Sequence, residues 1–115
     1  MGMNRLNLVV LRCADMERSK GFYEMLGMTF SRHRHGAGPE HYAHEDEHGV
    51  FELYPSAEPT SGDKTGLGFA ASDLENLRQL FTRAGFEPGP VKESAWGISF
   101  VVRDPDGRRV ELKRA

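Results

Sequence analysis

The chain contains little of what marks a secreted or membrane protein. Its 115 residues include one cysteine, one tryptophan and no apolar stretch that approaches the length of a bilayer span. The single cysteine, Cys13, excludes an intrachain disulfide framework, and the apolar run around it indicates a small buried hydrophobic residue. Because the sequence also has no secretory apolar segment, we expect a cytoplasmic protein without a membrane partner.

The chain also has little excess of charge of either sign. The formal net charge is −2 at pH 7, from 15 basic and 17 acidic residues. This balance gives no electrostatic reason to bind nucleic acid or an anionic membrane, so neither is expected as a partner. The closest basic cluster is interpreted as a solvated strand and tail. It comprises Arg103, Arg108, Arg109, Lys113 and Arg114.

The sequence does contain an internal duplication. Ala14–Glu17 aligns with Ser72–Glu75 at an offset of 58 residues, and Gly27 aligns with Gly85 at the same offset. Two glutamates in apolar surroundings, Glu52 and Glu111, follow at an offset of 59. A repeat of this length is one supersecondary unit used twice. Since a half of about 58 residues is marginal alone, we expect both halves in one domain.

Each half has the same predicted order of elements. The first half is predicted to contain strands over Leu6–Arg12, Met28–Arg34, Glu40–Glu45 and Val50–Tyr54 and a helix over Met16–Leu26. The second is predicted to contain strands over Gly66–Ala71, Ile98–Arg103 and Arg109–Lys113, an edge strand at Glu87–Gly89 and a helix between Asp73 and Gly85. Strand, helix, strand, strand, strand, used twice, predicts an α+β fold. The predicted domain covers residues 1–115, with repeat 1 over about 5–55, repeat 2 over about 65–115 and a linker over about 56–64.

Strand alternation assigns the two glutamates to faces. Side chains alternate across a strand, so Val110 and Leu112 point toward the helix and leave Glu111 on the other face. Glu52 correspondingly shares its face with Tyr54. We therefore expect both carboxylates to look into a common cleft.

Three segments carry a resemblance to a known family. They are Leu11–Asp15 followed by Ser19, Phe22–Tyr23 and Leu26–Gly27; Phe51–Tyr54; and Asp104–Gly107 followed by Val110–Leu112. In this order and at the spacing of the duplication, they resemble the vicinal oxygen chelate superfamily, which includes glyoxalase I, extradiol dioxygenases, fosfomycin resistance enzymes and bleomycin-binding proteins. The resemblance implies two βαβββ modules in tandem, whose curved mixed sheets surround a cleft in the glyoxalase-like fold.

The resemblance also implies a metal site, which this sequence matches in part. In metal-dependent relatives, each repeat supplies one ligand from its first strand and one from its last. Glu52 and Glu111 match the last-strand ligands, whereas the first-strand positions hold Leu8 and Gly66, whose side chains cannot bind a metal. Two carboxylates and waters would make a weak site for Mg²⁺ or Mn²⁺, with Zn²⁺ or Ni²⁺ as further candidates.

Other roles for these residues stay open. Without a metal, Glu52 and Glu111 would be acid–base groups in a pocket, or strand residues paired with a cation or facing solvent. Arg12 lies where glyoxalase I relatives hold an anionic substrate group, and a salt bridge to either glutamate is the alternative. Trp96 either walls the pocket, which we favour because Gly97 leaves room beside it, or fills the core.

All five histidines lie in one segment. They are His33, His35, His41, His44 and His48. His41 and His44, three residues apart on a strand, would point to opposite faces, which is the wrong spacing for a pair of metal ligands. The cluster is interpreted either as a solvated hairpin or as placing His41 in the cavity as a polar or acid–base group that contacts substrate.

Two functional hypotheses follow. The first is an enzyme-like protein of the glyoxalase, bleomycin resistance or dioxygenase type, a lyase or isomerase that binds a small organic molecule, with Glu111 and Glu52 as catalytic groups or metal ligands and Arg12 orienting an anion. The second is a metal-free module that sequesters a drug or metabolite. Chains of this size in the superfamily pair as homodimers, and two sheets with free edges agree with a homodimer here.

Overall fold

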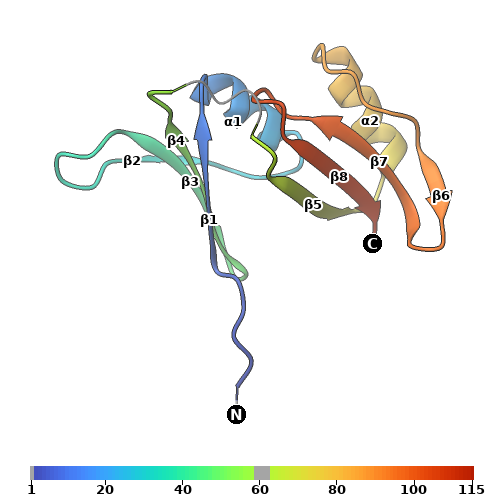
Figure 1. Cartoon of the computed structure of the whole chain (residues 1–115), viewed down its shortest axis with the longest axis horizontal. Coiled ribbons are helices and arrows are strands. Elements are labelled where there is room, and N and C mark those ends of the chain that lie inside the picture. The colour runs from blue at the N-terminus through green and yellow to red at the C-terminus, as the bar shows by residue number, and fades with distance from the viewer. Residues whose placement is uncertain (1, 59–62) are drawn as a thin grey trace. The chain divides into compact units, whose positions relative to one another are not determined.

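The computed structural model describes residues 2–58 and 63–115, in two compact units that meet in sequence at residues 60 and 61 (Figure 1). Each unit contains one of the predicted repeats. Residues 59–62 of the predicted linker lie outside the described ranges. Neither described helix is long and apolar enough to cross a membrane.

The first unit is a four-stranded mixed sheet with one helix. Its elements are β1 (Leu8–Cys13), α1 (Met16–Glu24), β2 (Ser31–His33), β3 (His41–Asp46) and β4 (Gly49–Pro55). The strand order is β1-β4-β3-β2, with β1 parallel to β4 and the other pairs antiparallel. Helix α1 packs against β3 and β4, and the core between them is apolar. Its buried side chains include Leu11, Cys13, Phe22, Tyr23 and Leu53.

The register of this sheet defines the face turned away from α1. Val10 and Arg12 of β1 lie opposite Glu52 and Tyr54 of β4, and Ala43 of β3 lies on the other side of Glu52. Because residues opposite one another share a face, and residues two apart along a strand do too, His41 and Leu8 belong to this face as well. The prediction that Glu52 shares a face with Tyr54 is confirmed.

The second unit repeats the arrangement. Its elements are β5 (Gly66–Ala71), α2 (Leu74–Arg83), β6 (Lys92–Ser94), β7 (Gly97–Arg103) and β8 (Arg109–Arg114), in the sheet order β5-β8-β7-β6. Helix α2 packs on β7 and β8, as Figure 1 shows. Val110 and Leu112 are fully buried beneath it, whereas Glu111 is only half-buried on the opposite face. The α+β fold of two βαβββ modules is confirmed.

The duplication extends to the helix ends. The side chain of Asp15 accepts a hydrogen bond from the Arg18 backbone N–H at 3.1 Å, and Asp73 accepts one from Asn76 at the same distance. Both helices are followed by a glycine with positive φ, +96° at Gly27 and +91° at Gly85. In each helix, the aspartate satisfies a backbone amide group at the start, and the glycine lets the chain reverse direction after the end.

The predicted edge strand at Glu87–Gly89 is wrong. The edge strand of the second sheet is β6, Lys92–Ser94, and the earlier segment is irregular. Pro88 and Pro90 carry no amide hydrogen and cannot supply a regular ladder. Gly89 instead makes two isolated hydrogen bonds. Its N–H donates to the Val101 carbonyl at 2.8 Å, and its carbonyl accepts from Arg78 Nε at 2.8 Å.

Candidate functional site

Each sheet has a face turned away from its own helix, called here the uncovered face. That of the first sheet carries a stack of three side chains. His41 lies flat against Tyr54, with ring centroids 4.1 Å apart and an interplanar angle of 9°. The Arg12 guanidinium lies over the Tyr54 ring, 4.8 Å from its centroid. Strand β3 positions the histidine, β4 the tyrosine and β1 the arginine. Two of these, Arg12 and His41, are predicted site residues, and the structure brings them together through Tyr54.

His41 is the polar centre of this face. Its side chain is 1% exposed. Its Nδ1 lies 3.3 Å from the Pro39 carbonyl oxygen, and because a carbonyl only accepts, Nδ1 carries the proton. The other ring nitrogen, Nε2, is buried without a hydrogen-bond partner among the described residues. The Glu52 Oε2 atom lies 3.4 Å from Nε2 without hydrogen-bond geometry.

A second histidine completes a group with metal-ligating potential. Within residues 2–58 and 63–115, one set of His, Cys, Asp and Glu side chains converges closely enough to hold a metal ion: His35, His41 and Glu52, whose ligand atoms all lie within 4.8 Å of one another. His35 follows strand β2 and its ring lies 5.1 Å from that of His41. Sequence spacing singled out His41 but not this partner, because the two meet only across the β2–β3 hairpin.

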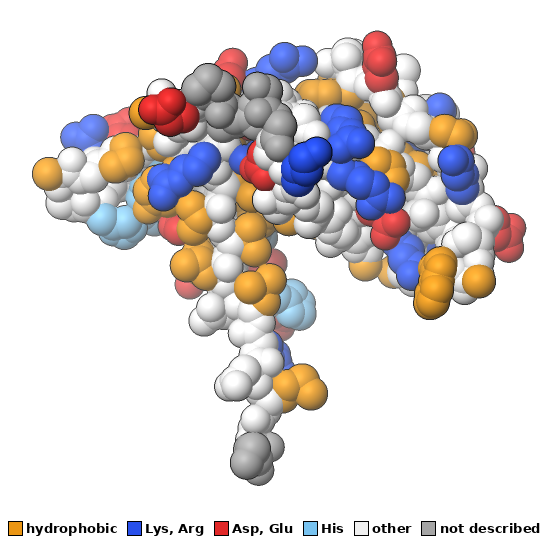
Figure 2. Space-filling model, in the orientation of Figure 1, with side chains coloured by type: hydrophobic (Ala, Val, Ile, Leu, Met, Phe, Trp, Pro, Cys, Tyr) orange, Lys and Arg blue, Asp and Glu red, His pale blue; other side chains and the backbone are white. Residues whose placement is uncertain are grey.

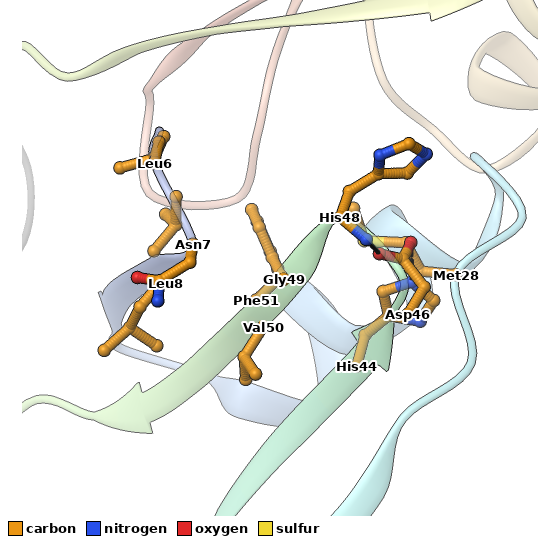
Figure 3. A pocket seen from close by; sticks show the side chains of 11 residues that line it. Leu6, Asn7, Leu8, Met28, His44, Asp46, His48, Gly49, Val50 and Phe51 are labelled. Carbon is orange, nitrogen blue, oxygen red and sulfur yellow. Dashed lines mark hydrogen bonds and ion pairs between the residues drawn. The ribbon is translucent and has the colours of Figure 1, made fainter. Parts of the chain in front are cut away.

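The ring of His33 also stacks beside that of His41, with centroids 6.0 Å apart, whereas His44 and His48 lie elsewhere in the unit. The exposed His48 is paired with Glu47 at 3.6 Å, and His44 Nε2 contacts Asp46 Oδ2 at 3.1 Å. Both line a shallow pocket of about 160 Å³ whose other side is formed by Leu8 (Figure 3). This volume is below that of ordinary small-molecule sites. For His48 the solvated interpretation holds.

Glu111 lines a larger hollow on the uncovered face of the second sheet. The hollow has a volume of about 330 Å³, and its walls include Trp96, Ser99 and Lys113. Trp96 is 82% exposed, which excludes a core role. The Glu111 carboxylate, 37% exposed, lies 3.9 Å from the Arg109 guanidinium. Lys113, which the sequence did not single out as a site residue, shares the face of Glu111 because it is two residues along β8.

The residues of β5 explain why the Glu111 side chain is partly exposed. Gly66, Gly68 and Ala70 occupy the uncovered face of this strand, with Gly68 directly opposite Glu111. Because glycine has no side chain and alanine only a methyl group, a second hollow of about 240 Å³ lies here, lined by Gly68, Ala70 and Glu111 among others. Glu111 therefore borders open space over both neighbouring strands.

The four-ligand metal site of the metal-dependent relatives does not fit this chain. Leu8 projects from β1 opposite Val50, and its side chain is 48% exposed and purely apolar. Gly66 lies opposite Arg109 on β5 and has no side chain at all. Neither first strand supplies a donor atom at these positions. No step of a mechanism can be assigned to a metal held there.

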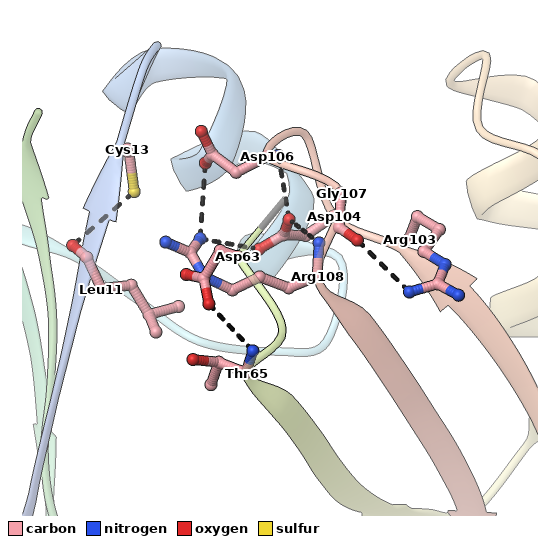
Figure 4. A network of polar contacts seen from close by, with 9 residues as sticks. All are labelled: Leu11, Cys13, Asp63, Thr65, Arg103, Asp104, Asp106, Gly107 and Arg108. Carbon is pink, nitrogen blue, oxygen red and sulfur yellow. Dashed lines mark hydrogen bonds and ion pairs between the residues drawn. The ribbon is translucent and has the colours of Figure 1, made fainter. Parts of the chain in front are cut away.

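A buried polar network fixes the turn that precedes β8 (Figure 4). Arg108, 1% exposed, contacts Asp63 at 2.7 Å, Asp104 at 3.1 Å and Asp106 at 3.4 Å. Burial alone would lower the pKa of Arg108, but hydrogen bonds to Asp104 and Asp63 outweigh it and raise the pKa. The prediction of a solvated basic cluster is wrong for Arg108, because three aspartates compensate its charge.

Comparison with known proteins agrees with this architecture. Residues 5–112 match the profile of the Glyoxalase/Bleomycin resistance protein/Dioxygenase superfamily. No curated protein sequence matches the chain significantly. Among solved structures, Oxidase ChaP-H2 is similar with a TM-score of 0.77 and 16% identity, over 99% of this chain and 95% of the other. That likeness shows the fold alone.

Two further structures are more similar in sequence. An integron cassette protein from the mobile metagenome of V. Cholerae, VCH_CASS1, has 28% identity and a TM-score of 0.67, over 99% of this chain and 97% of its own. Virulence protein STM3117 from Salmonella typhimurium has 25% identity and a TM-score of 0.67, over 99% and 98%. Because the family profile spans nearly the whole duplicated βαβββ chain, this protein belongs to the glyoxalase/bleomycin resistance protein/dioxygenase superfamily.

Proposed function

We propose that the protein binds a small organic molecule in the hollow beside Glu111. The volume of about 330 Å³ falls within the range of about 300–1,000 Å³ that is usual for small-molecule sites. Its lining combines an indole from Trp96, a carboxylate from Glu111 and an ammonium group from Lys113. This combination of an aromatic wall with two opposite charges is the observation that carries the proposal, since it offers stacking and oriented polar contacts to one ligand.

The single tryptophan makes the proposal directly testable. Trp96 is the only indole in the chain, so its fluorescence reports on this hollow alone. Titration with a panel of small organic acids and aromatic compounds should shift or quench it saturably. Lys113→Gln should weaken the binding of anionic ligands about 10- to 100-fold, the worth of one charge-assisted hydrogen bond. Lys64→Gln, at an exposed lysine outside the hollow, is the control. A saturable signal that both variants retain unchanged would contradict the assignment.

Arg12 is a separate candidate for anion recognition, on the first unit. A guanidinium stacked on an aromatic ring is held flat and presents its N–H edge to a carboxylate. Arg12→Met preserves the aliphatic stem and removes the charge. In calorimetric titrations it should reduce affinity for anionic members of the panel and leave neutral ones unaffected, with Arg83→Met on the surface of α2 as the control. Equal affinity of Arg12→Met and the parent for all anions would remove Arg12 as an anion-binding group.

The position of Glu111 favours a lyase or isomerase as a second candidate. A half-buried carboxylate at the edge of a ligand-sized hollow is placed to take a proton from a bound molecule, and such general bases contribute about 10²- to 10⁴-fold to a rate. Glu111→Gln should then keep the Trp96 fluorescence response and lose turnover by that factor. If the parent protein returns every bound ligand chemically unchanged, as mass spectrometry would detect, the protein sequesters its ligand instead.

A further inference from the structure

We propose that the first unit binds one divalent transition-metal ion through His35, His41 and Glu52. This site uses residues of a single βαβββ unit and shares only Glu52 with the four-ligand arrangement of the metal-dependent relatives. It goes beyond the proposed function, because it requires neither the hollow beside Glu111 nor an organic ligand.

The first argument is the state of His41 Nε2. The Pro39 carbonyl can only accept, so in the neutral ring the proton lies on Nδ1 and the lone pair on Nε2. The Nε2 atom is buried, has no hydrogen-bond partner among the described residues, and lies 3.4 Å from a carboxylate oxygen of Glu52. A ring nitrogen and a carboxylate oxygen this close out of water are stabilised by a positive charge between them, which a proton or a metal ion can supply.

The second argument is distance. Ligand atoms about 2.1 Å from an ion and at a tetrahedral angle are about 3.4 Å apart. The contact of His41 Nε2 with Glu52 Oε2 already has this separation, 3.4 Å. The third ligand atom belongs to His35 and lies within 4.8 Å of the other two. His35 is exposed on the hairpin, so core packing does not prevent its side chain from rotating toward the other two ligands.

The third argument is preorganisation. Metal-binding histidines ordinarily donate their second N–H to a carbonyl or carboxylate, which fixes the tautomer and the ring orientation. His41 makes this contact with Pro39, and its ring is clamped flat on Tyr54 at 4.1 Å. The ring therefore needs no reorganisation to bind an ion.

The donor set identifies the class of ion. Two imidazole nitrogens and one carboxylate oxygen suit Zn²⁺, Co²⁺, Ni²⁺ or Fe²⁺, whereas Mg²⁺ and Ca²⁺ prefer oxygen ligands. Three protein ligands leave a coordination position for water or a ligand oxygen, as in catalytic zinc sites. Of the metals that the sequence left open, this site takes Zn²⁺ or Ni²⁺ rather than Mg²⁺ or Mn²⁺.

The test is calorimetric titration of the metal-stripped full chain with ZnCl₂. We expect one Zn²⁺ per chain, and at least about tenfold weaker uptake in His35→Ala and in Glu52→Gln. The His35 side chain is exposed and the glutamine is nearly isosteric with glutamate, so both variants should keep the parent circular dichroism spectrum. His48→Ala, which removes an exposed histidine beside a glutamate, should leave uptake unchanged.

Titration with CoCl₂ gives a second readout. Its visible absorption depends on coordination geometry and should appear in the parent and in His48→Ala but be lost in His35→Ala. Absence of stoichiometric Zn²⁺ binding would overturn the proposal. So would equal loss in His35→Ala and His48→Ala, because that result is the signature of nonspecific binding to surface histidines.

Discussion

At the scale of the residue, Arg108 has the most demanding surroundings in the second unit. The guanidinium and the carboxylates of Asp104 and Asp106 are almost completely buried. Asp104 Oδ1 also accepts from the backbone N–H groups of Asp106 and Arg108, at 2.9 and 3.0 Å. Charges out of water are stable only while they are paired and hydrogen-bonded. The network therefore depends on every member being present.

Arg108→Met should destabilise the fold by about 3–5 kcal/mol, because it leaves buried carboxylates without their cation. Urea unfolding followed by circular dichroism measures this loss. The matched control is Arg103→Met at the end of β7, an exposed arginine that donates to the Gly107 carbonyl in the same turn. Its effect should stay within about 1 kcal/mol. Similar losses in the two variants would show that the buried network adds nothing beyond an ordinary surface contact.

Asp63 should make the stability sensitive to acid. Hydrogen bonds from the Thr65 backbone and side chain, and then from Arg108, lower the pKa of this carboxyl. A lowered folded-state pKa contributes stability that is present above the unfolded value and lost as the pH falls through the folded one, here below about pH 4. Asp63→Asn should therefore flatten the stability profile between about pH 4 and pH 2. Parallel profiles of the variant and the parent in urea melts would contradict this role.

At the scale of the element, helix α1 and the turn that follows it differ in what their glycines do. Gly21 lies inside the helix, and a Cβ there would meet no atom within 4 Å. Gly27 ends the helical segment at φ +96°, and a Cβ there would also meet nothing within 4 Å. Any difference between alanine substitutions at the two positions must come from backbone conformation rather than from packing.

Gly21→Ala should stabilise the protein by about 0.4–1 kcal/mol, because alanine is the better helix former and restricts the unfolded chain. Gly27→Ala should destabilise it by about 1–2 kcal/mol, because an L-residue is strained at positive φ. Chemical denaturation of both variants, with the midpoint and slope fitted separately, measures the two shifts. Effects of the same sign would refute the conformational explanation.

At the scale of the whole molecule, the sheet edges and uncovered faces bear on assembly. Strands β1 and β2 form the edges of the first sheet, and β5 and β6 those of the second. Leu8 and Val10 of β1 are 48% and 39% exposed, and Figure 2 shows hydrophobic side chains along this strand. Exposed edges beside apolar side chains favour association of copies.

The expected assembly is a homodimer. Light scattering at micromolar concentration should give about twice the chain mass of 12.9 kDa. Val10→Asp, which places a charge on the exposed apolar strand, should shift the mass toward one chain, whereas the same change at exposed Ala115 should not. A monomeric parent protein at all concentrations up to about 100 μM, far above the dissociation constant of a specific dimer, would contradict the expectation.

Interactions between residues close in sequence explain why the helix ends and the strand faces were predictable. The caps at Asp15 and Asp73 and the stops at Gly27 and Gly85 depend on neighbours within a few residues, so the helices were predictable from sequence. Alternation placed Glu52 and Glu111 on the uncovered faces for the same reason. The motifs at the spacing of the duplication indicated the family, and the resemblance implied that both first strands lack a metal ligand. That Glu52 and Glu111 share one cleft stays a prediction.

The sequence by itself determined the fold class, the two repeats and the faces of their strands, because these follow from short-range periodicity. Only the tertiary structure decided which polar groups meet. His35 and His41 come together because the β2–β3 register pairs His33 with His41, and Glu52 joins them from β4. Arg108 lies 45 residues from Asp63, and no local pattern distinguishes its buried side chain from its solvated neighbours. Such contacts depend on strand pairing across turns, which spacing along one strand does not encode.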